Sequence, residues 1–261
     1  MPGTDSAGQP WEGRTFEPNH AADDDGSAPE HLLEAIRRFR ARELGEIEVV
    51  DAIRSARLLI PLVAHLGEAD DHGHASEHEH EGVNGLRIDK SQELAIVTVT
   101  GPDGRTVLPA FTSVDAMRAW NPEARPIPAG AVRVAAAAVH EGTDLVVVDP
   151  TSETEFVLRR PTILAIAQGT PWAPSHQDPA VLAAFVEGVS GEPSVASVEL
   201  VPGDPDARLA GPELVVRLEL APGLTREDLA DLLGRVQQRW STSELIASRV
   251  DSMRVQLVAS A

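Results

Sequence analysis

The stretch LPAFTSVDAMRAW, residues 108–120, decides the fold of the N-terminal half of this chain. Its first four residues are apolar and end at Phe111, which predicts a strand that runs into the core. Thr112 or Ser113 then offers a hydroxyl that can cap a following helix, which we expect over residues 114–120. A ligand-binding turn at the same two residues is the alternative interpretation. The stretch therefore predicts a strand, a capped turn and a short helix in direct succession.

Upstream of this stretch, the pattern predicts two helices, a strand and a hairpin. A helix is expected over residues 31–44, where apolar residues recur at helical spacing, and a second one over 47–55. A strand follows at residues 58–63, in which Pro61 favours an edge position or a bulge. The turn sequence Gly-Pro-Asp-Gly then predicts a hairpin. Its two strands are expected at residues 94–100 and 105–111.

Downstream, a Pro-rich connector leads into further helices and strands. In the first lobe we expect helices at 129–140 and 161–168, and strands at 145–148 and 155–159 around a turn at Asp149-Pro150. After a joint at 173–178, we expect helices at 179–188 and 225–240, and strands at 195–201, 213–220 and 252–258. The elements predict an α+β protein of two lobes, each a small, mostly antiparallel sheet with helices packed on it.

The expected domain organisation follows from these elements and from composition. Residues 1–26 lack periodicity and are expected to form a disordered acidic tail. Residues 27–172 form the first α+β domain and 179–261 a smaller one. The first domain contains a polar segment at 66–91, too long for a simple connection in a compact domain.

Composition and charge exclude several classes of function. The chain has no cysteine among its 261 residues, so disulfides, thiolate metal sites and thiol nucleophiles are ruled out. The net charge is −19, of which residues 1–30 and residues 66–82 contribute −6 each. A nucleic-acid partner needs a large basic face, which the sequence does not provide. Because apolar runs are far shorter than the ~20 residues of a membrane span and no secretory signal is found, we expect no membrane partner and a cytoplasmic location.

Three motifs of the first domain carry a resemblance to a known family. They are LIPL at residues 59–62, LPAFTS at 108–113 with Trp120 beyond it, and LVVVDP at 145–150. Together they resemble the N-terminal domain of the SseB family, the enhanced serine sensitivity proteins, most closely those of actinobacterial type. The residues that carry the resemblance are Pro61, Pro109, Phe111, Thr112, Ser113, Trp120, Asp149 and Pro150. The resemblance implies no catalytic residue and no cofactor.

The polar segment holds the sharpest candidate for a chemical site. His72, His74, His78 and His80 form two His-x-His pairs among six carboxylates. In an extended chain each pair projects both rings to one side, and imidazole with carboxylate suits Zn²⁺ or Ni²⁺. The segment therefore predicts weak Zn²⁺ or Ni²⁺ binding. A solvated, His-rich loop without a metal is the alternative interpretation.

No local motif indicates an enzyme. Phosphate-binding glycine loops, the dinucleotide fingerprint and the H-E-x-x-H metalloprotease motif are all missing from the sequence. The sequence therefore favours a non-catalytic cytoplasmic protein that acts by protein–protein or small-ligand binding, its partner an unknown protein or a second copy of the chain. The alternative is a protein that responds to Zn²⁺ or Ni²⁺ through the His-rich segment.

Overall fold

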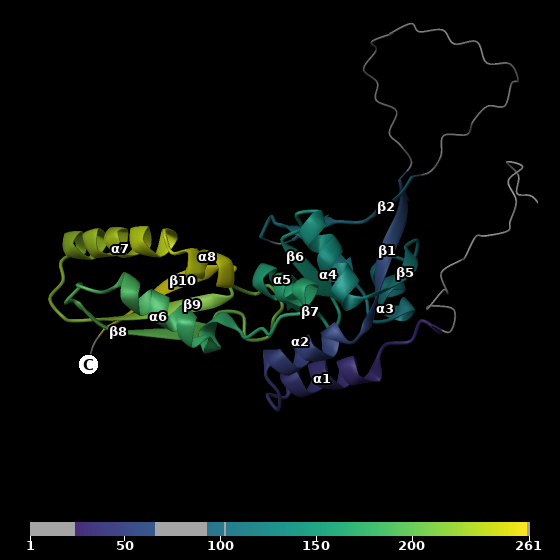
Figure 1. Ribbon diagram of the computed structural model, residues 1–261, viewed down its shortest axis with the longest axis horizontal. Helices are drawn as coiled ribbons and strands as arrows, with labels where there is room; N and C mark the ends of the chain where they lie inside the picture. Colours follow the sequence, from purple (N-terminus) through teal and green to yellow (C-terminus); the bar gives the residue numbers. More distant parts are fainter. Residues whose placement is uncertain (1–23, 66–92, 102, 260–261) are drawn as a thin grey trace, which may run out of the picture.

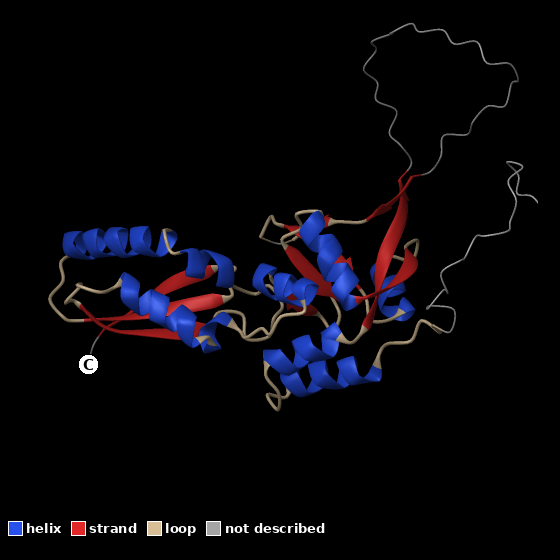
Figure 2. Cartoon of the chain, viewed as in Figure 1, coloured by secondary structure: helices blue, strands red, loops and turns tan. Residues whose placement is uncertain are grey.

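The computed structural model describes residues 24–65, 93–101 and 103–259 (Figure 1). Helices and strands are interspersed along these residues and form two lobes, which Figure 2 shows side by side. Of the neighbouring strand pairs, five are antiparallel and two are parallel. The predicted α+β class is confirmed.

The first lobe is built on two small sheets. The antiparallel sheet has the order β2-β1-β5, formed by β2 (Glu93–Ile96), β1 (Arg57–His65) and β5 (Arg125–Gly130). The mixed sheet has the order β3-β4-β6-β7, formed by β3 (Val99–Thr100), β4 (Thr106–Ala110), β6 (Leu145–Val148) and β7 (Phe156–Leu158). Only β4 and β6 are parallel within it.

The decisive stretch also joins these two sheets, which its sequence did not predict. Leu59 in β1 and Phe111 after β4 exchange two backbone hydrogen bonds, 2.7 and 2.8 Å long. Phe111 is fully buried, and its ring lies 5.3 Å from that of Trp120. The predicted helix is confirmed as α3 (Val114–Trp120), and the Ser113 hydroxyl caps it by accepting from Ala116 N–H at 3.0 Å.

The remaining helices of the first lobe cover the core. They are α1 (Glu30–Arg40), α2 (Glu46–Arg54), α4 (Ala131–His140) and α5 (Arg160–Gln168). On α1 the apolar residues Leu32, Ile36 and Phe39 share one buried face, because they recur at helical spacing. The Phe39 ring meets the edge of Phe156 from β7 at 5.5 Å, so α1 packs against the mixed sheet.

Three expectations about strands are wrong. The expected strand 94–100 is divided between β2 and β3, which lie in different sheets, and the Pro-rich connector forms β5. Pro61 lies in β1, the central strand of its sheet, rather than at an edge. Proline is tolerated at this position because β1 pairs with β2 only from Leu62 onward. The side of Pro61 that lacks an N–H faces β2, which has already ended at Ile96, so no ladder hydrogen bond is lost.

The second lobe is one sheet with helices on one face. Its elements are η1 (Ser175–Gln177), α6 (Pro179–Gly188), β8 (Val195–Pro202), β9 (Leu214–Leu220), α7 (Arg226–Ser241), α8 (Glu244–Arg249) and β10 (Met253–Ala259), and only η1 and α8 were not predicted. The sheet order is β10-β9-β8, with β10 parallel and β8 antiparallel to β9. Phe185 and Trp240 lie edge to face at 5.0 Å in the core. The opposite face of the sheet is polar, with Arg217 paired to Glu199 at 3.2 Å.

A loop of the second lobe inserts into the first. The loop between β8 and β9 places Ala207 in the hydrophobic core of the first lobe, 5 % exposed. The Ala207 carbonyl accepts a 2.9 Å hydrogen bond from Val157 N–H on β7. Leu209 packs against the apolar cluster that Val157 forms with residues of β4 and β6. The loop therefore covers the edge of the mixed sheet and connects the two lobes by a backbone hydrogen bond and apolar contacts.

Among the helices of the described part of the chain, none combines the length and apolar character needed to cross a membrane.

Candidate functional site

The residues that carry the family resemblance meet at the ends of β4 and β6. The Asp149 carboxylate is buried and accepts from the Thr112 N–H and from the Thr112 hydroxyl, each at 2.7 Å. It also accepts from the Thr154 hydroxyl at 2.7 Å. Asp149 and Thr151 both have positive φ, of 47° and 67°, so the turn after β6 is tightly shaped. These polar groups bond to one another, and no group of this network is left over for a ligand.

The other residues of the resemblance lie around this network. Pro109 lies in β4 opposite Val147, and Pro150 follows Asp149 in the turn. Phe111, Ser113 and Trp120 belong to the strand end and helix already described, whereas Pro61 lies in the other sheet. The structure thus brings together most of the residues that the sequence singled out, around a buried hydrogen-bond network rather than a cavity.

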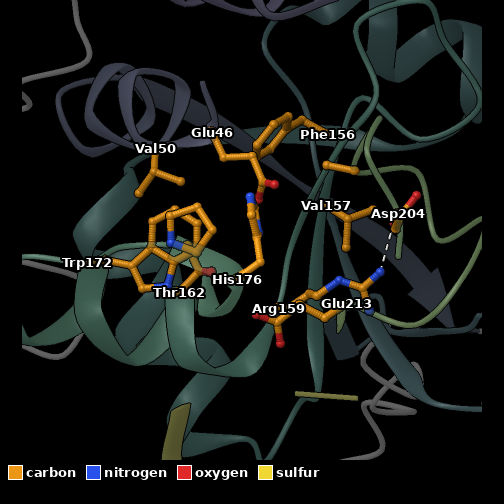
Figure 3. Close-up of a pocket in the computed structure, with 12 residues that line it drawn as sticks. Glu46, Val50, Phe156, Val157, Arg159, Thr162, Trp172, His176, Asp204 and Glu213 are labelled. Carbon is orange, nitrogen blue, oxygen red and sulfur yellow. Dashed lines mark hydrogen bonds and ion pairs between the residues drawn. The ribbon is translucent and has the colours of Figure 1, made fainter. Parts of the chain in front are cut away.

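A second polar cluster lies where the lobes meet (Figure 3). Arg159, at the end of β7, is 7 % exposed and donates to Asp204 at 2.8 Å and to Asp251 at 3.1 Å. Asp251 also pairs with Arg105 at 2.8 Å, and its own carboxylate is almost fully buried. A buried charge is stable only when it is paired and hydrogen-bonded, and here each charge of the first lobe is neutralised by the second.

Arg159 and Asp204 also line a small cavity at this contact, which we term the junction cavity. Its other titratable lining residues are Glu46 in α2, His176 in η1 and Glu213 just before β9. Burial, with the nearby Glu213 carboxylate as a smaller cause, raises the pKa of Glu46 to about 7. Burial also raises the pKa of Glu213, and it lowers the pKa of His176. Figure 3 shows the Glu46 and His176 side chains directed into the same space.

The junction cavity is too small for a substrate. Its free volume is about 20 Å³, which accommodates a single water molecule. Shifted pKa values in a cleft often mark functional sites, but they also arise in buried ion-pair networks. The arrangement can store a proton at the contact between the lobes, and it offers no space for a reacting molecule.

A larger depression, which we term the apolar groove, opens between the two sheets of the first lobe. It encloses about 560 Å³, within the range of ligand pockets. Its floor is aliphatic and comes from β1, β4, β5 and α4: Ile60, Leu62, Leu108, Ile127, Ala129, Val134 and Ala137. Its rim is polar, with Thr98, Arg133, Glu141 and Thr143. Ile127 remains 43 % exposed in spite of its size, so an apolar surface is open to solvent there.

Two charged side chains, those of Arg133 and Glu141, also line the apolar groove. Arg133 and Glu141 lie eight residues apart on one face of α4 and its C-cap, about 12 Å along the helix axis. Within the described residues Arg133 makes no ion pair, whereas Glu141 lies 3.7 Å from His140. The groove therefore combines an aliphatic lining with one positive and one negative side chain that are two helical turns apart on α4.

The metal prediction concerns residues that the structure does not describe. His72, His74, His78 and His80 lie outside the described residues, so the predicted Zn²⁺ or Ni²⁺ binding stays a prediction. Within 24–65, 93–101 and 103–259, no group of three or more histidine or acidic side chains could hold a metal ion.

The fold around the apolar groove corresponds to one family domain. The profile of the SseB protein N-terminal domain matches residues 30–165, which run from the start of α1 into α5. The chain belongs to the SseB family. The SseB domain contains the Thr112–Asp149 network and the whole apolar groove, while Asp204 and Glu213 of the junction cavity lie beyond it. No curated protein and no solved structure matches the chain.

Sequence reasoning missed both cavities of this SseB-family protein. The groove residues come from four elements and are ordinary aliphatic core residues, so no local motif marks them. One usable signal was the pair of prolines at residues 126 and 128, which are typical of a protected edge strand and could have revealed β5.

Proposed function

We propose that this SseB-family protein binds a small molecule with an apolar body and one carboxylate in the apolar groove. The observation that carries the proposal is the combination of a large aliphatic floor with one arginine at the rim. Burial of an apolar ligand there is favoured by about 25 cal/mol for each Å² removed from water. Arg133 supplies the charge-assisted hydrogen bonds that a carboxylate needs.

The opposite end of the groove supports a monocarboxylate over a dicarboxylate. Glu141 lies about 12 Å from Arg133 along α4, close to the length of an extended ten-carbon chain. A second carboxylate at the far end of such a ligand would face Glu141 and be repelled. The proposal therefore includes a charge preference, and it assigns no reaction to the protein.

Isothermal titration calorimetry with decanoate, decanol and the ten-carbon dicarboxylate sebacate tests the proposal. We expect decanoate to bind most tightly, and Arg133→Gln to weaken decanoate about tenfold while leaving decanol unchanged. Glu141→Gln should strengthen sebacate selectively. Ala137→Trp, which fills the groove floor, should abolish binding of all three. Its matched control is Ala136→Trp, because Ala136 is exposed on the same helix and does not line the groove.

The proposal fails if decanoate shows no saturable binding, or if Ala137→Trp binds it as well as the unaltered protein does. Equal affinity for decanoate in the Arg133→Gln variant would exclude the assigned role of the arginine. Circular dichroism of each variant separates loss of binding from loss of fold.

A further inference from the structure

The outer strand of the second lobe has an open edge. Among the strands of the described residues, β10 pairs with β9 alone, and it is the terminal strand in the order β10-β9-β8 (Figure 1). Its residues MRVQLVA include neither lysine nor proline, the residues that most often protect an edge strand. Leu257 and Val258 are 41 % and 40 % exposed. The strand is therefore seven residues long and mostly apolar, with Arg254 as its one charged side chain, and its outer edge is open among the described residues.

Backbone geometry shows which residues present their polar groups to this open edge. The Ser252 carbonyl accepts a 3.0 Å hydrogen bond from Leu214 N–H, so it faces β9. Since the backbone groups of alternate residues point to the same side of a strand, those of Gln256 also face β9. Val255 and Leu257 accordingly direct their N–H and carbonyl groups outward, and they are available to pair with another strand.

The sequence of β10 is complementary to itself in an antiparallel register. If two copies pair around a twofold axis at Gln256, Val255 of each copy lies opposite Leu257 of the other. Both residues have outward-facing backbone groups, so they form a hydrogen-bonded pair of the antiparallel ladder. Val255 and Leu257 lie on the same face of the sheet, and Val255 already packs against the core of the lobe. The pairing of the two strands therefore places Val255 of one copy beside Leu257 of the other and covers Leu257.

Charges on the opposite face of the sheet complement each other in the same register. Arg254 lies opposite Val258 of the second copy, and Val258 lies beside Glu219 on β9. Arg254 and Glu219 of the second copy are then two strand spacings apart, about 10 Å, which two long side chains can bridge over the smaller Val258. Within the described residues Arg254 makes no ion pair, and Glu219 has only the Ser197 hydroxyl, at 2.7 Å.

We propose that two copies of this chain associate through antiparallel pairing of β10 with β10, which creates a continuous six-stranded sheet. The pairing is centred on Gln256 and carries two symmetric Arg254–Glu219 ion pairs. It satisfies the open edge, covers Leu257 and Val258, and leaves the apolar groove of the first lobe free.

Size-exclusion chromatography with light scattering on the full chain tests this proposal. We expect twice the 27.8 kDa chain mass. Arg254→Glu and Glu219→Arg should each weaken the dimer at least tenfold, and the double variant should recover it, because the pair is restored with reversed polarity. Arg226→Glu, an equal charge reversal on the exposed start of α7, is the matched control and should remain dimeric.

Leu257→Pro provides a second test that does not depend on charge. It removes an N–H that faces the open edge, so pairing with β9 is kept while pairing with a second copy is lost. A monomeric unaltered chain at micromolar concentration would overturn the proposal. So would a dimer that survives both Leu257→Pro and Arg254→Glu, or a double variant that stays monomeric while folded by circular dichroism.

Discussion

Thr112 and Asp149 are 37 residues apart in the sequence, and both hydrogen bonds between them measure 2.7 Å. They connect the end of β4 to the end of β6, two parallel neighbours in the mixed sheet. The same carboxylate holds Thr154 in the following turn. One side chain thus fixes the turns at which both strands leave the core.

Replacement of Asp149 by asparagine is predicted to destabilise the protein by about 2 to 3 kcal/mol. The amide keeps the size of the side chain and tolerates positive φ, but it replaces one acceptor oxygen with a donor that faces buried donors. Urea denaturation measures the loss. Asp231→Asn on the exposed face of α7 is the control and should change the free energy of unfolding by less than about 0.5 kcal/mol. Equal effects of the two variants would contradict the prediction.

Arg159→Ala is predicted to cost about 3 to 5 kcal/mol, because it leaves Asp204 and Asp251 buried without their shared cation. Arg159→Lys should recover only part of this loss, since an ammonium group cannot reproduce the two-armed contact of the guanidinium. Thermal unfolding of both variants, with Arg118→Ala at an exposed position as control, measures the effect. A stable Arg159→Ala variant would mean that solvent enters the junction freely.

The junction cavity predicts that stability depends on pH through Glu46. Its pKa is 4.5 in the unfolded chain and about 7 in the folded protein, so the folded state binds more protons between these values. The free energy of unfolding should therefore fall as the pH rises from 4.5 to about 7, by on the order of 2 kcal/mol. His176 acts in the opposite direction, because burial lowers its pKa from 6.5.

The contribution of Glu46 is isolated by comparison with Glu46→Gln. This variant should be more stable than the unaltered protein above pH 7, where Glu46 is charged, and nearly equal to it below pH 4.5. Urea denaturation across the window measures the difference. Glu187→Gln on the exposed face of α6 should show no such pH-dependent difference. A gain that is independent of pH would contradict the assignment to this carboxyl group.

Two glycines in the helices of the second lobe should respond in opposite ways to alanine. A Cβ on Gly188 would overlap the Trp240 indole, whose Nε1 donates to the Phe185 carbonyl at 3.1 Å, so Gly188→Ala should destabilise by about 1 to 3 kcal/mol. Gly234 lies on the exposed face of α7 with free space around it, so Gly234→Ala should stabilise by about 1 kcal/mol. Thermal unfolding compares them, and the same sign for both would contradict the packing argument.

The prediction for the His-rich segment depends on the sequence alone. Deletion of residues 66–82 should abolish the binding of Zn²⁺ or Ni²⁺, measured by calorimetry on protein without a histidine tag. Decanoate binding should persist in the same variant, because the apolar groove is formed by residues outside the deletion. Metal binding that survives the deletion would place the site elsewhere in the chain.

Local patterns in the sequence predicted most elements because those elements depend on local chemistry. The Ser113 cap of α3 and the end of the strand at the buried Phe111 could both be predicted, because each depends on residues within one turn of the chain. β5 was missed because its two prolines resemble a connector and only pairing with β1 makes it a strand. The break between β2 and β3 was missed for a similar reason, since their side chains continue one apolar pattern while their partners lie in different sheets.

The candidate sites were beyond sequence reasoning because they depend on long-range contacts. Arg159 and Asp204 are 45 residues apart and belong to different lobes, and the sequence around Asp204 indicated only a turn. Thr112 and Asp149 were singled out in two separate motifs. Nothing in either motif indicated that the two side chains are hydrogen-bonded to each other. The apolar groove is visible only when β1, β5 and α4 are placed together.

The insertion of Ala207 and Leu209 has a consequence for how this chain can be divided. The family domain at residues 30–165 lacks the segment that completes its own hydrophobic core and covers its sheet edge. Cleavage between the lobes would therefore produce two fragments that recognise each other, rather than two independent proteins. The segment 202–213 is the part that the family domain lacks, so the chain is a natural starting point for fragment complementation.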